Sequence, residues 1–140
     1  MGTSVFVRIF NETGDHVLMV RNKRESMRDV WTLPGGGVGR GESPLWTVHR
    51  ELQEETGLKA EISPKPIYDK LRGDNKRIIV FEGKNARGIL KPVDKDIAEA
   101  EWVYWPFLML DDPQDCQYKG FAVYEDHLSY IQLAATEVVA

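Results

Sequence analysis

Residues 35–57 read GGGVGRGESPLWTVHRELQEETG, a glycine-rich segment followed by signals that begin and end one helix. Ser43 is a favoured N-cap, and Pro44 is a favoured first helical residue. Gly57 is the residue type that most often ends a helix, because it adopts a left-handed conformation without a steric penalty. The sequence therefore predicts a helix over residues 44–56, directly after a backbone segment that allows close approach of a ligand.

The predicted helix has one apolar face. Leu45, Val48 and Leu52 recur at spacings of three and four residues, so they form a stripe that packs against a core. Trp46 lies beside this stripe. Two interpretations of Trp46 stay open, a contact at a subunit interface and a wall of the functional site.

The last turn of the helix carries three carboxylates, Glu51, Glu54 and Glu55, at spacings that place them on one face. Like charges at this spacing repel each other by about 0.2–0.5 kcal/mol per pair. The helix C-terminus carries partial negative charge, which disfavours the carboxylates again. We therefore expect a positive partner beside them, and a divalent cation is the simplest one.

The spacing of these residues resembles a complete Nudix box. Gly36 is followed after five residues by Glu42, and after seven more by RELQEETGL at residues 50–58. The resemblance extends to the WTLPGG sequence at residues 31–36 and to DIAEAEWV at residues 96–103.

The resemblance implies an α/β fold, a Nudix-type α/β/α sandwich with a mixed β-sheet, in which residues 1–140 form a single domain. The hydrophobic pattern predicts a similar mixture of elements. Strands are expected within residues 4–10, 16–21, 31–38, 60–71, 76–83 and 100–105, helices at residues 106–110 and 124–138, and a loop at residues 85–94. The first two strands are expected to pair as a hairpin through a turn at residues 11–15.

The resemblance also implies an activity, the hydrolysis of a nucleoside diphosphate linked to another group. It assigns the metal ligands, which are Glu51, Glu54, Glu55, the carbonyl of Gly35, and Asp96. Mg²⁺ or Mn²⁺ is the expected cofactor, because Mg²⁺ binds a few carboxylates together with waters and substrate phosphates. Such a metal lowers the pKa of a bound water, which then attacks phosphorus and cleaves the phosphoanhydride bond.

Three residues are predicted to act in catalysis, namely Glu51, Arg50 and Glu54. Glu51 is a metal ligand, the general base, or both. Arg50 is expected to pair with a glutamate and to orient it. Glu42 has three open interpretations, a lock for the preceding loop, a group that reaches the metal site, and a negative charge that compensates the dipole at the helix N-terminus.

Cations before Trp31 are the candidates for binding substrate phosphates. Four cations, Arg21, Lys23, Arg24 and Arg28, lie in or beside this loop and could hold a phosphate, because guanidinium and ammonium groups bind phosphate well. Of these, Arg21, Lys23 and Arg28 are predicted to take this role. The alternative is a solvated polar loop.

Composition limits the partners. The chain has 140 residues, a net charge of −4 and one cysteine, Cys116. The negative charge disfavours broad nucleic-acid binding, and the single thiol suits a reducing compartment, so a cytoplasmic location is expected. No signal peptide or membrane span is expected from the sequence. The expected partner is a small-molecule nucleotide or nucleotide conjugate. A homodimer is left open.

Two other functions remain as alternatives. A nucleotide-sensing Nudix module would bind a nucleotide without hydrolysing it, but such modules often lose motif acids, and this chain keeps them. A Nudix fold used for isomerisation of a diphosphate would need additional metal-binding histidines and a catalytic cysteine. The three histidines, His16, His49 and His127, have no metal-ligand spacing.

Overall fold

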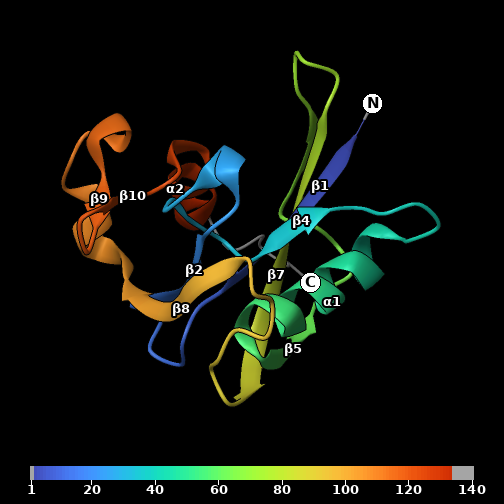
Figure 1. The fold of residues 1–140 in the computed structure, drawn as a ribbon, viewed down its shortest axis with the longest axis horizontal. Helices are drawn as coiled ribbons and strands as arrows, with labels where there is room; N and C mark the ends of the chain where they lie inside the picture. The colour runs from blue at the N-terminus through green and yellow to red at the C-terminus, as the bar shows by residue number, and fades with distance from the viewer. Residues whose placement is uncertain (1, 134–140) are drawn as a thin grey trace.

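The computed structural model describes residues 2–133, which form two larger β-sheets, a two-stranded ribbon and two α-helices (Figure 1). The α-helices are α1 (Pro44–Thr56) and α2 (Glu125–Gln132), and short 3-10 helices span Glu25–Met27, Trp105–Met109 and Pro113–Asp115. The strands are β1 (Thr3–Ile9), β2 (His16–Asn22), β3 (Trp31–Thr32), β4 (Gly35–Gly37), β5 (Leu58–Ile62), β6 (Tyr68–Leu71), β7 (Arg77–Gly88), β8 (Ile97–Tyr104), β9 (Gln117–Tyr118) and β10 (Phe121–Ala122).

The larger sheet has the strand order β4-β1-β7-β5, and β6 also pairs with β7. Strand β1 runs parallel to β7, whereas the other pairs in this sheet are antiparallel, so the sheet is mixed. The second sheet, β3-β2-β8, is antiparallel, and β9 pairs with β10 in a small ribbon. The predicted α/β fold with a mixed sheet is confirmed.

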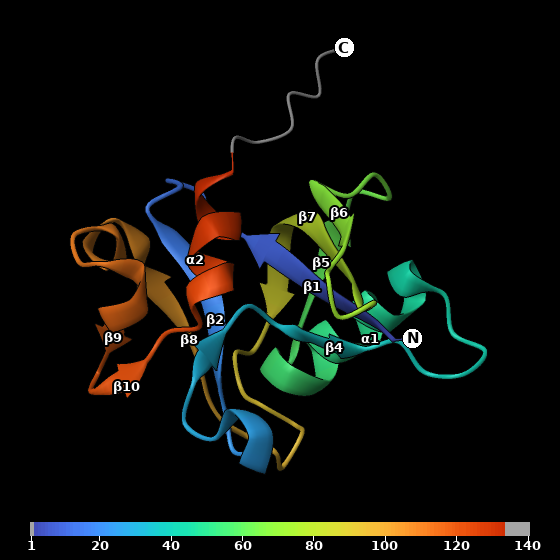
Figure 2. The ribbon, with the colours of Figure 1, turned by 90° about the horizontal axis from the view of Figure 1, so that it is seen from above.

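The two helices cover different faces of the larger sheet (Figure 2). On one face, Val5 and Val7 of β1 pack with Val48 and Leu52 of α1. On the other face, Ile78 and Val80 of β7 belong to the cluster that includes Leu128 and Ile131 of α2. Because alternate residues of a strand point to opposite faces, one sheet supports both layers of the sandwich.

The turn expected at residues 11–15 forms, with the Asn11 N–H donating to the His16 carbonyl at 3.0 Å, but the first two strands do not pair along their length as the expected hairpin. Strands β1 and β2 have the predicted positions, but they lie in different sheets and share only the isolated bridge between Phe10 and Val17 among the described residues. The parallel partner β7 and the antiparallel partner β4 already occupy both edges of β1. Pairing with segments distant in sequence therefore replaces the pairing of β1 with β2 beyond the turn, although the turn itself is present.

The prediction of a loop at residues 85–94 is also partly wrong, because β7 continues to Gly88. Its extension pairs with β5, with Leu58 opposite Gly88, and the register shifts between Lys59 and Glu61. This partner supplies backbone hydrogen bonds that the polar composition of the segment does not reveal.

The helical predictions agree better with the structure. Helix α1 has the predicted bounds, and the short helix expected at residues 106–110 is the 3-10 helix Trp105–Met109. Helix α2 ends at Gln132, and the last part of the expected helix, residues 134–138, lies outside the described residues. Within residues 2–133, no helix has the length and apolar character needed to cross a membrane.

Arg8 of β1 is a fully buried cation that fastens α2 to the larger sheet. Its guanidinium donates to the carbonyls of Tyr130 and Ile131 at 2.9 and 3.3 Å and also to that of Leu133. Its Nε donates to Glu82 of β7 at 3.0 Å. A cation is favourable at a helix C-terminus, where the last carbonyls have no helical partner.

We predict that Arg8→Met lowers the free energy of unfolding by about 3–5 kcal/mol, because it leaves Glu82 and the helix carbonyls unpaired. Arg77→Met, which breaks the exposed pair with Asp69, should cost less than about 1 kcal/mol. Urea denaturation of both variants measures these changes. Equal effects of the two substitutions would refute the anchoring role of Arg8.

Candidate active site

The acidic turn of α1 has a fixed position, because both ends of the helix are capped. The hydroxyl of Ser43 accepts a hydrogen bond from the Trp46 N–H at 3.1 Å, and Gly57 ends the helix with φ 78°. The Gly57 N–H donates to the carbonyl of Gln53 at 2.9 Å. The sequence-predicted caps therefore hold the last turn beside strand β4.

The carboxylate of Glu55 lies against β4 and is almost fully buried. Its Oε1 accepts a hydrogen bond from the Gly35 N–H at 2.9 Å. A Cβ at Gly35 would lie 2.0 Å from the carbonyl oxygen of Val5, and a Cβ at Gly36 would lie 3.0 Å from the carboxyl carbon of Glu51. Two successive glycines therefore let the strand pack between β1 and the glutamates.

Burial is the largest cause of the pKa shifts of Glu51 and Glu55. It holds the pKa of Glu55 well above its ordinary range, although the Gly35 N–H opposes this effect. Burial also raises the pKa of Glu51, and the Arg50 charge opposes it. The neighbouring acids add to this effect, because Glu54 raises the pKa of Glu51 and Glu51 raises the pKa of Glu55. Without a further cation, the negative form of both carboxyls is therefore disfavoured.

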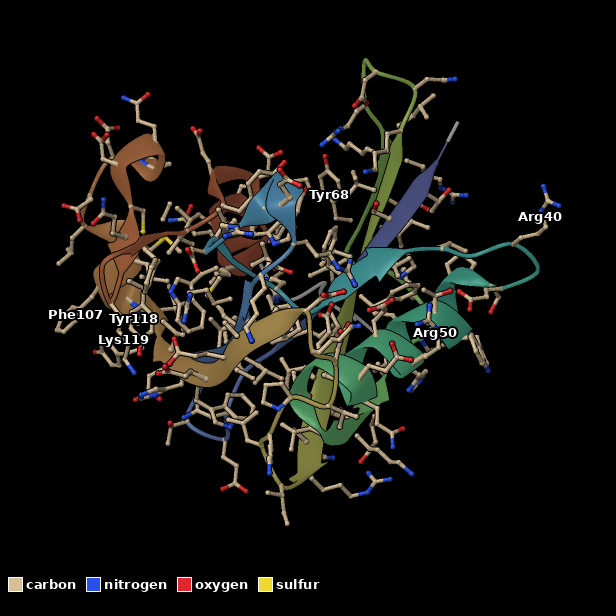
Figure 3. All side chains as sticks on the ribbon, in the orientation of Figure 1. Arg40, Arg50, Tyr68, Phe107, Tyr118 and Lys119 are labelled. Carbon is tan, nitrogen blue, oxygen red and sulfur yellow. The ribbon has the colours of Figure 1, made fainter. Side chains whose placement is uncertain are left out.

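Arg50 is the cation that holds this acidic turn together (Figure 3). Its guanidinium lies 3.1 Å from Glu42, 3.1 Å from Glu51 and 3.0 Å from Glu54. These partners, with the hydrogen bond to Glu42 contributing most, raise the pKa of Arg50. Within the described residues, Arg50 Nε and Glu51 Oε2 are buried polar atoms without a hydrogen-bond partner.

Glu42 fastens the loop that precedes α1. Its Oε1 accepts hydrogen bonds from the Gly39 N–H and the Thr47 hydroxyl, both at 2.9 Å, as well as from Arg50. The Gly39 bond is the largest of the effects that lower the pKa of Glu42. These contacts match the loop-locking interpretation, and Figure 3 shows Arg40 at the outer end of the loop, away from Arg50.

The donor atoms of the acidic turn fit a divalent cation. Glu51 presents a buried oxygen with no partner, and the Glu54 side chain is 43% exposed. Across residues 2–133, however, no three His, Cys, Asp or Glu side chains are already arranged as a metal site. Arg50 contributes to this arrangement, because its guanidinium occupies one oxygen each of Glu51 and Glu54.

Asp96 lies in a segment that docks on the end of α1. The N–H groups of Val93 and Asp94 donate to the Glu54 carbonyl at 2.9 and 2.8 Å. The Asp96 carboxylate lies 3.8 Å from Arg24, which also lies 3.5 Å from Asp94. The segment therefore places two further acids beside Arg24, which pairs with both.

Sequence reasoning included Arg24 among four possible phosphate-binding cations but did not predict its place beside the acidic turn, and it missed Asp94. Arg24 lies close enough to Glu51 and Glu55 to lower the pKa of each. It was one cation among several in a polar loop, and nothing in the spacing distinguished it from its neighbours. Asp94 had no signal either, because its position depends on how the segment after β7 docks on α1.

The three cations predicted to bind phosphate have different surroundings. Arg21 pairs with Asp29 and Glu99, and its guanidinium lies 4.2 Å from the Phe121 ring centroid. Lys23 and Arg28 have exposed side chains. Arg21 is therefore held by internal partners, whereas the other two can contact a solute without losing such contacts.

The aromatic side chains that could stack on a nucleobase differ in how deeply they are buried. Trp31 and Phe81 are buried in the two core clusters, and Tyr68 and Trp105 pack partly against the first of them. Trp46 differs, because it is 55% exposed. Cys116 is buried, and burial raises the pKa of its thiol, as expected for a small core residue.

Comparisons with known proteins agree with this geometry. The NUDIX domain family matches residues 2–116. The 8-oxo-dGDP phosphatase NUDT18 of Mus musculus is 30% identical over 113 residues, which are 78% of this chain and 34% of the relative, so the chain spans about a third of that protein. An RNA pyrophosphohydrolase of Nitratiruptor sp. is 31% identical over 100 residues, 64% of each chain.

A solved structure shows the same fold. The MutT NUDIX hydrolase from Burkholderia pseudomallei superposes with a TM-score of 0.67 and 20% identity, and the match covers 95% of this chain and 97% of the other. At this identity the likeness concerns the fold alone.

The raised pKa of Glu55 predicts a pH-dependent effect of Glu55→Gln on stability without metal. Below the unfolded pKa near 4.5, the carboxyl is protonated in both states, so the substitution changes little. As the pH rises, the unfolded chain releases the proton first, and folded wild-type protein loses stability relative to the variant. In EDTA, the variant's Tm advantage should therefore grow from about pH 4 to about pH 7.

Thermal melts over this pH range measure the effect, with the exposed Glu12→Gln as the control. If the Tm difference between Glu55→Gln and the wild type stays constant with pH, the substitution acts through packing and not through the buried charge.

Proposed function

This chain belongs to the Nudix family, and we propose that it is a metal-dependent hydrolase of a phosphoanhydride bond in a nucleotide or nucleotide conjugate. The observation that carries the proposal is the juxtaposition of buried, incompletely neutralised Glu51 and Glu55 with the glycines of β4. A protein that needed only a stable helix would gain from replacing these acids, so their retention indicates a charged ligand.

We propose Mg²⁺ or Mn²⁺ as the cofactor, since members of this family generally use divalent cations. Glu51, Glu54, Glu55, the Gly35 carbonyl and Asp96 would hold the metal. When bound, it supplies neutralisation of the phosphate charge and a more acidic water.

The protein's own residues then divide the remaining work. Glu55 stays in place through its bond to the Gly35 N–H, so it acts as a fixed ligand. Glu51, with its pKa raised by burial and its free Oε2, is suited to accept a proton from the attacking water. Arg50 keeps Glu51 and Glu54 oriented, and its link to Glu42 limits how far it moves.

Substrate phosphates would enter from the side on which Arg24 lies. Its side chain is 44% exposed, and its two ion pairs, at 3.5 and 3.8 Å, are long for guanidinium–carboxylate bonds. We propose that Arg24 binds phosphate once Asp96 turns to the metal, with Lys23 and Arg28 nearby in the chain as additional cations. Arg21, also predicted for this role, would first have to leave Glu99 and Asp29.

Hydrolysis is favoured over sensing because Arg50, Glu51, Glu54 and Glu55 are all present and close together. The relatives are named for 8-oxo-dGDP and for RNA, so the common feature that we carry over is a phosphoanhydride next to a nucleotide. The proposed partner is a small-molecule nucleotide. A cytoplasmic location is proposed from the free, buried thiol of Cys116.

We predict that Glu54→Gln and Glu55→Gln each lower kcat by about 100-fold or more with Mg²⁺, because each removes a charged oxygen ligand. Released phosphate or pyrophosphate measures turnover of nucleoside triphosphates, and chromatography of the released nucleotides measures turnover of sugar nucleotides and dinucleoside polyphosphates. The exposed Glu61→Gln serves as the control, and circular dichroism verifies folding. Wild-type turnover in both variants would reject the metal role, and tight binding without hydrolysis across the panel would favour the sensor.

A further inference from the structure

A cavity of about 450 Å³ opens beside α1, next to the acidic turn but distinct from the contact between α1 and β4. It is lined by Trp46, His49, Arg50, Gln53, Glu54 and Val93. Its volume lies within the usual range for small-molecule sites.

The helical part of this lining is a second face of α1. Trp46, His49, Arg50 and Gln53 follow one another at spacings of three, one and three residues, so they share a face that differs from the packing stripe of Val48 and Leu52. The Trp46 side chain is 55% exposed. The exposed part of this indole is available to a planar ligand.

Val93 provides the opposite side of the cavity and is 75% exposed. It belongs to the segment that docks on the Glu54 carbonyl, so its position is tied to the acidic turn. The cavity therefore has an apolar aromatic surface, an apolar side chain, and the polar ends of His49 and Gln53, as expected for a site that binds a flat heteroaromatic group.

The cavity is also connected to the proposed active site through Arg50. The guanidinium lies 5.6 Å from the Trp46 ring centroid and 3.0 Å from Glu54. One nucleotide can therefore contact Trp46 with its base while its phosphates lie at the glutamates.

We propose that this cavity is a nucleobase subsite, in which Trp46 stacks on the base of the nucleotide while Gln53 and His49 contact its polar edge. The proposal rests on the hydrolase function proposed above and adds a residue that recognises the substrate. A neutral base suits the cavity better than a second anionic group, because Glu54 forms part of the lining. Every nucleobase can stack on an indole, so Trp46 should increase the affinity for nucleotides in general and should not select one base over another.

Calorimetric titration with Mg²⁺ and two non-hydrolysable probes tests the subsite. α,β-Methylene-ADP carries a base, whereas methylenediphosphonate carries only the phosphorus groups. Trp46→Ala should weaken α,β-methylene-ADP binding by about tenfold, and Trp46→Phe should retain most of the affinity because a ring remains. Binding of methylenediphosphonate should be unchanged in both variants.

Phe107→Ala is the matched control, because Phe107 is another exposed aromatic residue, 68% exposed, and lies far from Arg50 (Figure 3). It should leave both affinities unchanged. Quenching of tryptophan fluorescence by α,β-methylene-ADP in the wild type should be largely lost in Trp46→Phe.

Three results would overturn the subsite. They are wild-type affinity of Trp46→Ala for α,β-methylene-ADP, an equal loss of affinity for both probes, and a wild-type dimer that Trp46→Ala dissociates without changing nucleotide binding. If the subsite alone is wrong, the wild type still hydrolyses nucleotides. A wild type that binds neither probe and hydrolyses no nucleotide overturns both proposals.

Discussion

The interaction on which the site depends is the pairing of Arg50 with the glutamates of its own helix. Glu51 and Glu54 lie within 3.1 Å of the same guanidinium, and Glu55 is buried behind them. One cation does not neutralise three carboxylates at the negative end of a helix dipole. The free protein therefore holds its acids in an incompletely compensated state that a divalent cation can relieve.

The fold serves this arrangement by bringing a glycine strand against the acidic turn. Strand β4 pairs with β1, so Gly35 presents its N–H to Glu55 while Gly36 leaves room for Glu51. The two glycines thus have a steric role, in contrast to the flexible loop that glycine-rich sequences often indicate. The docked segment around Asp94 closes the arrangement from the side of the second sheet.

The helix and its acids could be predicted from sequence because their signals are local. Caps at Ser43 and Gly57 fix the bounds of α1, and helical spacing gathers the glutamates. Strand pairing was harder to predict, because β1 pairs with β7, which is distant in the chain, and not with the nearby β2. The role of Arg24 was equally hidden, because an arginine in a polar loop gives no sign of the carboxylates that the fold brings to it.

Crystals soaked in Mn²⁺ test the central claim most directly through anomalous scattering. The electrostatic account predicts a peak bounded by oxygens of Glu51, Glu54 and Glu55, with the guanidinium of Arg50 displaced from Glu54 and still bound to Glu42. Crystals that show no such peak at saturating Mn²⁺, with Arg50 still paired to Glu51 and Glu54, would contradict it.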